Sequence, residues 1–283
     1  MNAKFSNSGS ILSGANGFTG GGLNQPSAIA LDGQGNAWVP DQGSKSVIKL
    51  DNHGGILSGA SGFQIGTGYP TGVAIDGVGN AWVGNGSATV TEFSNNGTLL
   101  SGSTGYPITD TLGVAIDASG NAWLNVQMST GFFELSPSGV QLGGHSNCSN
   151  PPGLQGGGHY LVNCYYSVPN VFALDGAGNV WGVVTFQWNP ISHPPTPEFS
   201  TAVAEMTNTG TIVSGKLGYA GSTSLGSVGQ FLNVSVQGIA IDGGGNVWMM
   251  LSNNTVAEFV GAATPVVTPF SLGVKNGTLG SRP

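Results

Sequence analysis

The sequence predicts an all-β protein: a β-propeller of four-stranded antiparallel blades, with five full repeats and an N-terminal half repeat, hence five or six blades. Three observations predict this fold. Glycine accounts for 50 of the 283 residues and charged residues for only 7%, which is typical of a turn-rich chain. A nine-residue motif recurs five times, and each copy belongs to a unit of four short β-branched or alternating runs. Hydrophobic residues, at 39%, suffice for a core.

The recurring motif, A-[IL]-D-x-x-G-N-[AV]-W, has the features of a β-hairpin turn followed by a core strand. Its aspartate can accept backbone N–H bonds inside the turn, and its Gly-Asn pair tolerates the left-handed backbone of a tight reversal. Its tryptophan opens the second strand, where one large side chain can fill the wedge between neighbouring sheets. We therefore expect structural roles for Asp32 and Trp38, Asp76 and Trp82, Asp117 and Trp123, Asp175 and Trp181, and Asp242 and Trp248.

A second pattern, [VF]-x-E-[FL]-x-x-x-G, follows the motif and supplies the outer two strands of a unit. The repeat units then span about 26–59, 70–102, 111–144, 170–215 and 237–268, in a single domain of residues 1–283. Residues 3–14 match the second half of a unit, and residues 269–283 form a tail. The half unit either closes the ring by strand exchange between the termini or is the remnant of an upstream blade. Closure matters because an open ring exposes an unpaired sheet edge.

Together the two patterns resemble NHL repeats and the related streptogramin (virginiamycin B) lyase-like β-propellers, over nearly the whole chain. The resemblance implies the propeller fold. It selects no activity, because such propellers include binding modules, lyases and lactone hydrolases. For a lyase of the streptogramin kind, it implies His and Glu side chains at the propeller mouth with a divalent metal.

Three inserts lengthen the later units, at 144–170, 185–201 and 216–237, and we expect them on one face around the fourth blade. Binding residues concentrate in loops that a rigid scaffold holds. The inserts are aromatic, polar and nearly uncharged, which suits a neutral ligand such as a glycan, or a peptide; alternatively, the aromatics only pack the inserts against the blades. The candidate ligand-binding residues are His145, His159, Tyr160, Tyr165, Tyr166, Phe186, Trp188, His193 and Glu198.

The acidic residues include few candidates for catalytic groups. The repeats leave only Asp41, Asp110 and Glu198 unexplained, so paired carboxylates or a carboxylate-bound metal have few groups to draw on. We assign no catalytic residue, metal or cofactor, and the leading hypothesis is a non-enzymatic propeller that binds a small neutral ligand, a glycan or a protein. One alternative is a lyase-like or lactonase-like enzyme with a divalent metal, using the His-bearing inserts. Another is a structural surface repeat protein.

The charge and the cysteine content limit which partners and which cellular compartment the sequence predicts. Six Lys and Arg residues and a net charge of −7 exclude nucleic acid as a main partner, and no apolar run is long enough for membrane insertion. Cys148 and Cys164 could form a disulfide in an oxidising compartment, or remain two unrelated buried thiols. The charge-poor surface favours an extracellular, periplasmic or cell-surface monomer. The chain has no signal peptide, so we expect a truncated or mature form.

Overall fold

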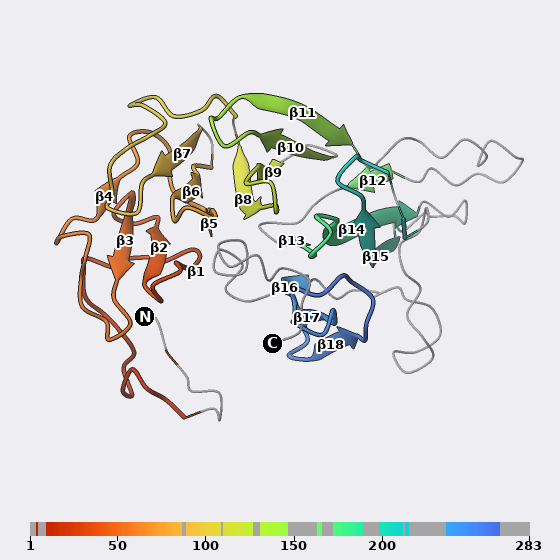
Figure 1. Cartoon of the computed structure of the whole chain (residues 1–283). Helices are drawn as coiled ribbons and strands as arrows, with labels where there is room; N and C mark the ends of the chain where they lie inside the picture. The colour runs from red at the N-terminus through yellow and green to blue at the C-terminus, as the bar shows by residue number, and fades with distance from the viewer. Residues whose placement is uncertain are drawn as a thin grey trace, which may run out of the picture.

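A computed structural model describes Lys4 and residues 10–86, 89–108, 110–126, 131–146, 163–165, 172–188, 198–211, 213–214 and 236–266. Within these ranges the chain consists of antiparallel sheets without a helix, so the prediction of an all-β fold is confirmed. It therefore contains, in these ranges, no apolar helix of the length that a bilayer crossing requires. Five sheets follow one another in chain order around an arc, from the orange sheet nearest the N-terminus to the blue sheet beside the C-terminus (Figure 1).

Four of the sheets are simple meanders, in which consecutive strands pair. The first contains β1 (Ala30–Leu31), β2 (Ala37–Asp41), β3 (Ser46–Leu50) and β4 (Phe63–Gln64). The second contains β5 (Gly72–Ile75), β6 (Ala81–Gly84) and β7 (Val90–Phe93), and the third contains β8 (Thr111–Ile116), β9 (Ala122–Val126), β10 (Gly131–Leu135) and β11 (Gln141–Ser146). The fifth contains β16 (Val236–Ile241), β17 (Val247–Leu251) and β18 (Val256–Phe259).

The fourth sheet is enlarged. It contains β12 (Asn163–Tyr165), β13 (Phe172–Leu174), β14 (Val180–Trp188) and β15 (Glu198–Met206). β14 pairs with β15 along its whole length, while its other edge pairs with β13 near the start and with β12 near the end. β14 and β15 have nine residues each, against at most six in the other described strands.

The fourth strand of the second unit is reduced to two separate bridges. In the second unit, Leu99 bridges Phe93 and Tyr106 bridges Val90, with a glycine turn at Gly102 and Gly105 between them. Both glycines have positive φ angles, at 71° and 68°, which L side chains rarely adopt. The turn interrupts the regular ladder, so this sheet has three named strands where the sequence predicts four.

The core lies between the sheets. Trp38 of the first sheet packs against Val73 and Ile75 of the second, and the tryptophans of the second, third and fourth sheets pack in the same way against the sheet that follows. These four side chains are fully buried: Trp38, Trp82, Trp123 and Trp181. The fifth, Trp248, is 38% exposed, and no sheet follows it among the described residues.

Candidate functional site

The carboxylates of the repeated aspartates accept hydrogen bonds from their own turns. Asp32 accepts hydrogen bonds from the backbone N–H and Nδ2 of Asn36, both at 3.0 Å, and from Nε1 of Trp38 at 3.2 Å. The indole-to-carboxylate bond recurs in the other four units at 2.9–3.3 Å. These carboxylates hold the hairpin and fix the tryptophan, which leaves them little capacity for a ligand.

The residue opposite each tryptophan on the third strand completes this cluster. In the first unit it is Lys49, whose Nζ lies 3.1 Å from Asp32 Oδ2 and 4.5 Å from the centroid of the Trp38 ring. Burial raises the pKa of Asp32, but the hydrogen bonds from Asn36, Lys49 and Trp38 outweigh burial and hold this pKa below its ordinary value. The lysine thus neutralises a buried carboxylate.

Glutamate takes the place of lysine in the other four units, opposite the tryptophan in each. Glu92 accepts hydrogen bonds from Nδ2 of Asn80 at 3.0 Å and from the hydroxyl of Tyr106 at 2.6 Å. Burial raises the pKa of Glu92, and the nearby charge of Asp76 raises it further. Burial and the bond to Glu92 also raise the pKa of Tyr106. A perturbed carboxyl can mark a catalytic site, but both oxygens of Glu92 are used inside the blade, which indicates a structural role.

Two of the three carboxylates that the repeats leave unexplained lie in the described core or turns. Asp41 is fully buried and accepts hydrogen bonds from the backbone of Asn24 at 2.7 Å and the hydroxyl of Ser44 at 2.6 Å. Asp110 has a φ of 57° and precedes β8. Across the described ranges, no group of three or more His, Cys, Asp and Glu residues is placed to hold a metal ion.

The insert residues that the structure describes lie on the enlarged fourth sheet and on the neighbouring edge strand. Trp188 pairs with Glu198 at the end of the long β14–β15 hairpin, and Phe186 lies between Ser200 and Cys164 in the ladder. Tyr165 of β12 pairs with Thr185 of β14, and His145 of β11 pairs with Phe132 of β10. Backbone pairing therefore brings Phe186, Trp188, Glu198 and Tyr165 onto one sheet, whereas His145 belongs to the preceding sheet. The remaining predicted residues, His159, Tyr160, Tyr166, His193 and Cys148, lie outside the described residues.

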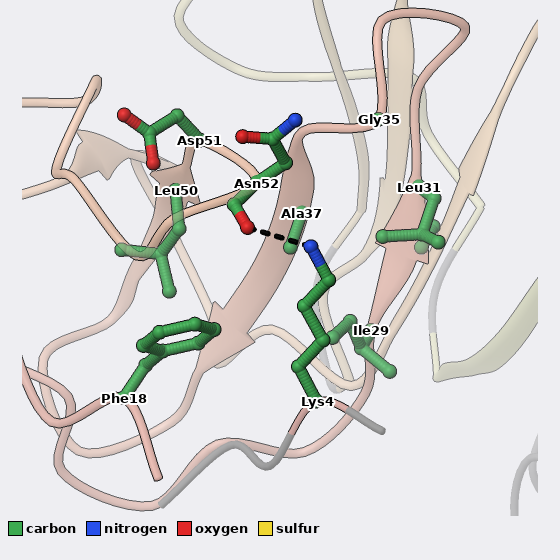
Figure 2. A pocket seen from close by; sticks show the side chains of 10 residues that line it. Lys4, Phe18, Ile29, Leu31, Gly35, Ala37, Leu50, Asp51 and Asn52 are labelled. Carbon is green, nitrogen blue, oxygen red and sulfur yellow. Dashed lines mark hydrogen bonds between the residues drawn. The ribbon is translucent and has the colours of Figure 1, made fainter. Parts of the chain in front are cut away.

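A pocket that the sequence did not predict opens beside the first sheet. Its volume is about 260 Å³, and we name it the Lys4 pocket (Figure 2). Figure 2 shows Phe18 next to Leu50 on one side, Ile29 and Leu31 on the other, and the Lys4 side chain between them, with its Nζ bonded to the carbonyl oxygen of Asn52. One feature of the sequence indicated this pocket: residues 3–14 match the outer half of a unit, and no tryptophan motif stands before them.

Comparison with known proteins identifies the fold. No protein-family model matches the chain, and no curated protein matches its sequence. A solved structure provisionally assigned as a gluconolactonase is similar over 91% of this chain and 80% of its own, with 14% identity and a TM-score of 0.54. At this identity the likeness shows the fold alone, and it is the propeller fold that the repeats predict.

Two lyase structures are also similar. A streptogramin B lyase aligns over 84% of both chains, with 14% identity and a TM-score of 0.48. A catalytically inactive virginiamycin B lyase from Staphylococcus aureus, solved with quinupristin, aligns over 85% of this chain and 86% of its own, with 13% identity and a TM-score of 0.47. Both belong to the group of propellers that the sequence motifs resemble.

Proposed function

We propose that the protein is a non-enzymatic propeller that binds a neutral ligand, a glycan or a peptide, at the extended edge of its fourth sheet. One observation carries the proposal: β14 and β15 are nine residues long, and β12 adds a further strand to β14 at the end of this hairpin. A strand pair longer than the strands of the other sheets extends the backbone ladder of this sheet into a platform for a ligand.

The residue types at this platform suit a neutral ligand. Phe186 and Trp188 lie two residues apart near the end of β14, and Glu198 pairs with Trp188. Aromatic side chains offer a large apolar surface at low entropic cost, and a carboxylate beside them can accept hydrogen bonds from sugar hydroxyls or peptide N–H groups. The formal charge of −7 for the whole chain disfavours anionic ligands.

The proposal is tested by a glycan and peptide array probed with the folded protein, followed by calorimetry on the best ligand. Trp188→Ala and Glu198→Gln are expected to weaken binding at least tenfold while the far-UV circular dichroism stays unchanged. Trp248→Ala is the matched control, because it removes an exposed tryptophan from a different sheet. A blank array, or equal losses for Trp188→Ala and the control, would contradict the proposal.

The fold favours a second candidate, a metal-dependent lyase-like or lactonase-like enzyme. Its support is the likeness to the gluconolactonase structure, and the groups it would use are His145, His159, His193 and Glu198. The test is turnover of lactones and of cyclic depsipeptide lactones, with and without added divalent cations. Turnover that a chelator abolishes and that is lost in His145→Ala and His193→Ala would replace the binding proposal with this one.

We further propose that the ring has six blade positions, five filled by the described sheets and one begun by the half unit beside the first sheet. The hydrogen bond from Lys4 to Asn52, which places the half unit next to that sheet, supports this count. The low surface charge supports an extracellular or cell-surface location for a monomer. Small-angle scattering distinguishes a six-position ring from a narrower five-bladed one by its radius of gyration.

A further inference from the structure

The chain departs from the repeat pattern after β18. In the second unit, Phe93 ends the third strand and is followed by a turn and by residues 98–102, which carry the outermost part of the unit. In the fifth unit, Phe259 stands at the position of Phe93, but residues 260–266 contain no copy of that segment and form no strand. We name residues 263–266 the strap.

The strap is hydrogen-bonded to the hairpin turns of two sheets. The backbone N–H of Thr264 donates to Asp175 Oδ2 at 3.1 Å, and its carbonyl accepts from the N–H of Gly176 at 3.1 Å. Both partners lie in the turn between β13 and β14 of the fourth sheet. The N–H of Ala263 donates to the carbonyl of Gly245 at 2.9 Å, in the turn between β16 and β17 of the fifth sheet. The strap therefore spans the junction of these two sheets.

Between the first and second sheets, a side chain makes the same two bonds. Asn95 lies in the turn after β7 and donates from Nδ2 to the Asp32 carboxylate of the preceding sheet at 3.4 Å. It also donates to the carbonyl of Gly79 in its own sheet at 3.3 Å. Asp32 and Gly79 stand at the repeat positions of Asp175 and Gly245. The backbone of the strap thus replaces a turn side chain as the tie between neighbouring sheets.

The fifth sheet is covered on one face. Its core residues pack against Trp181 of the fourth sheet, and Val266 of the strap belongs to the same buried cluster. The opposite face carries Trp248, Met250 and Val256, all of which are exposed. A sheet that packs on one face and is tied by one short segment opens at a lower free energy than sheets that pack on both faces.

We propose that the strap is a latch on the junction between the fourth and fifth sheets. While its bonds to the two turns are made, the fifth sheet stays docked on the fourth. When the strap lifts off, β16, β17 and β18 detach as one unit and uncover the face of the fourth sheet that carries Trp181, while the first three sheets remain folded. The latch acts between two sheets and does not depend on the proposed ligand binding.

One glycine allows the strap to be displaced without a change in the turn that it contacts. A Cβ added to Gly176 would overlap the carbonyl oxygen of Pro265 in the strap, whereas one added to Gly33 would meet no atom within 4 Å. Gly33 has the position of Gly176 in the first unit, and the third unit has Ala118 there, so the turn itself accepts alanine. Gly176→Ala is therefore the test variant, and Gly33→Ala is its matched control.

The measurement is backbone hydrogen exchange of the full chain, followed by mass spectrometry. We expect Gly176→Ala to speed exchange in β16, β17 and β18 about tenfold or more and to leave β2, β3, β5 and β6 at the parent rate. Gly33→Ala should leave both regions at the parent rate. Val266→Ser is a second test variant, because it removes a buried apolar side chain from the strap and leaves both turns unchanged. It should reproduce the effect of Gly176→Ala.

Three results would overturn the proposal. In the first, Gly176→Ala and Val266→Ser speed exchange within the strap alone, which would make the strap a local contact without a hold on the fifth sheet. In the second, exchange rises equally in all sheets, so that the fifth sheet does not detach by itself. In the third, Gly176→Ala exchanges like Gly33→Ala, so that displacing the strap has no consequence.

Discussion

Replacing Lys49 by glutamate tests the electrostatic roles assigned to the first two units. In the first, the Lys49 ammonium neutralises buried Asp32 at 3.1 Å. In the second, Glu92 stands at the same position and is held by the hydroxyl of Tyr106 at 2.6 Å. Phe63 is the counterpart of Tyr106 in the first unit and lacks the hydroxyl. We therefore expect Lys49→Glu to destabilise the fold and Phe63→Tyr to rescue part of the loss.

The magnitudes follow from burial. The Lys49 and Asp32 side chains are 5% and 0% exposed, and removing one partner of a buried ion pair costs about 3–5 kcal/mol. The hydroxyl of Phe63→Tyr can reach the new carboxylate, because the Phe63 ring lies 5.6 Å from its tryptophan and the Tyr106 ring lies 5.4 Å from its own. A hydrogen bond to a charged group contributes about 1.5–3 kcal/mol. The double variant should recover that amount.

The assay is urea unfolding at pH 7, followed by tryptophan fluorescence, for the parent, both single variants and the double variant. A double-mutant cycle then gives the coupling free energy, which we expect to be about 1.5–3 kcal/mol in favour of the pair. Val78→Glu, at a position that is 81% exposed, is the control for the added negative charge and should have little effect. Strictly additive single effects would refute the assigned role of the tyrosine hydroxyl.

Two further predictions concern the repeat motif. Trp123→Ala, at a fully buried side chain, should lower the free energy of unfolding by about 3–5 kcal/mol, whereas Trp248→Ala should cost clearly less because its side chain is 38% exposed; equal losses in urea unfolding would contradict the packing described for the fifth sheet. The hydrogen bond from Trp248 lowers the pKa of Asp242 to about 2. Since the folded-state pKa of Asp242 is depressed, this stabilisation is present above about pH 4 and is lost as the pH falls through about 2. Asp242→Asn should therefore reduce the change of the urea midpoint with pH over that range. A pH dependence equal to that of the parent protein would count against the bond.

The repeat motif made the blades predictable. The Asp-x-x-Gly-Asn hairpin is held by bonds within seven residues, from the backbone of Asn36 and the indole of Trp38 to Asp32, so a single unit contains everything that defines it. The same locality made the all-β fold and the inner strands recognisable. The fourth strand was predicted less well, because the glycine turn at Gly102 and Gly105 splits it into two bridges.

The sequence predicted a functional site in the inserts. It did not predict the Lys4 pocket. The β14–β15 pairing that joins Trp188 to Glu198 crosses an insert, and a residue count alone does not fix the register of such a hairpin. The Lys4 pocket depends on contacts between residues far apart in the chain, such as Lys4 and Asn52. Composition and spacing carry no information about which apolar positions remain uncovered.

The parts of each blade could be predicted from the sequence: the hairpin, the tryptophan hydrogen-bonded to its aspartate and the polar residue opposite that tryptophan, because these interactions are local and recur in all five units. How the blades meet depends on tertiary contacts. Trp38 is fully buried and Trp248 is 38% exposed, although the two lie in nearly identical motifs. The physical reason is that each tryptophan is covered by the sheet that follows it, and whether such a sheet is present is a property of the ring.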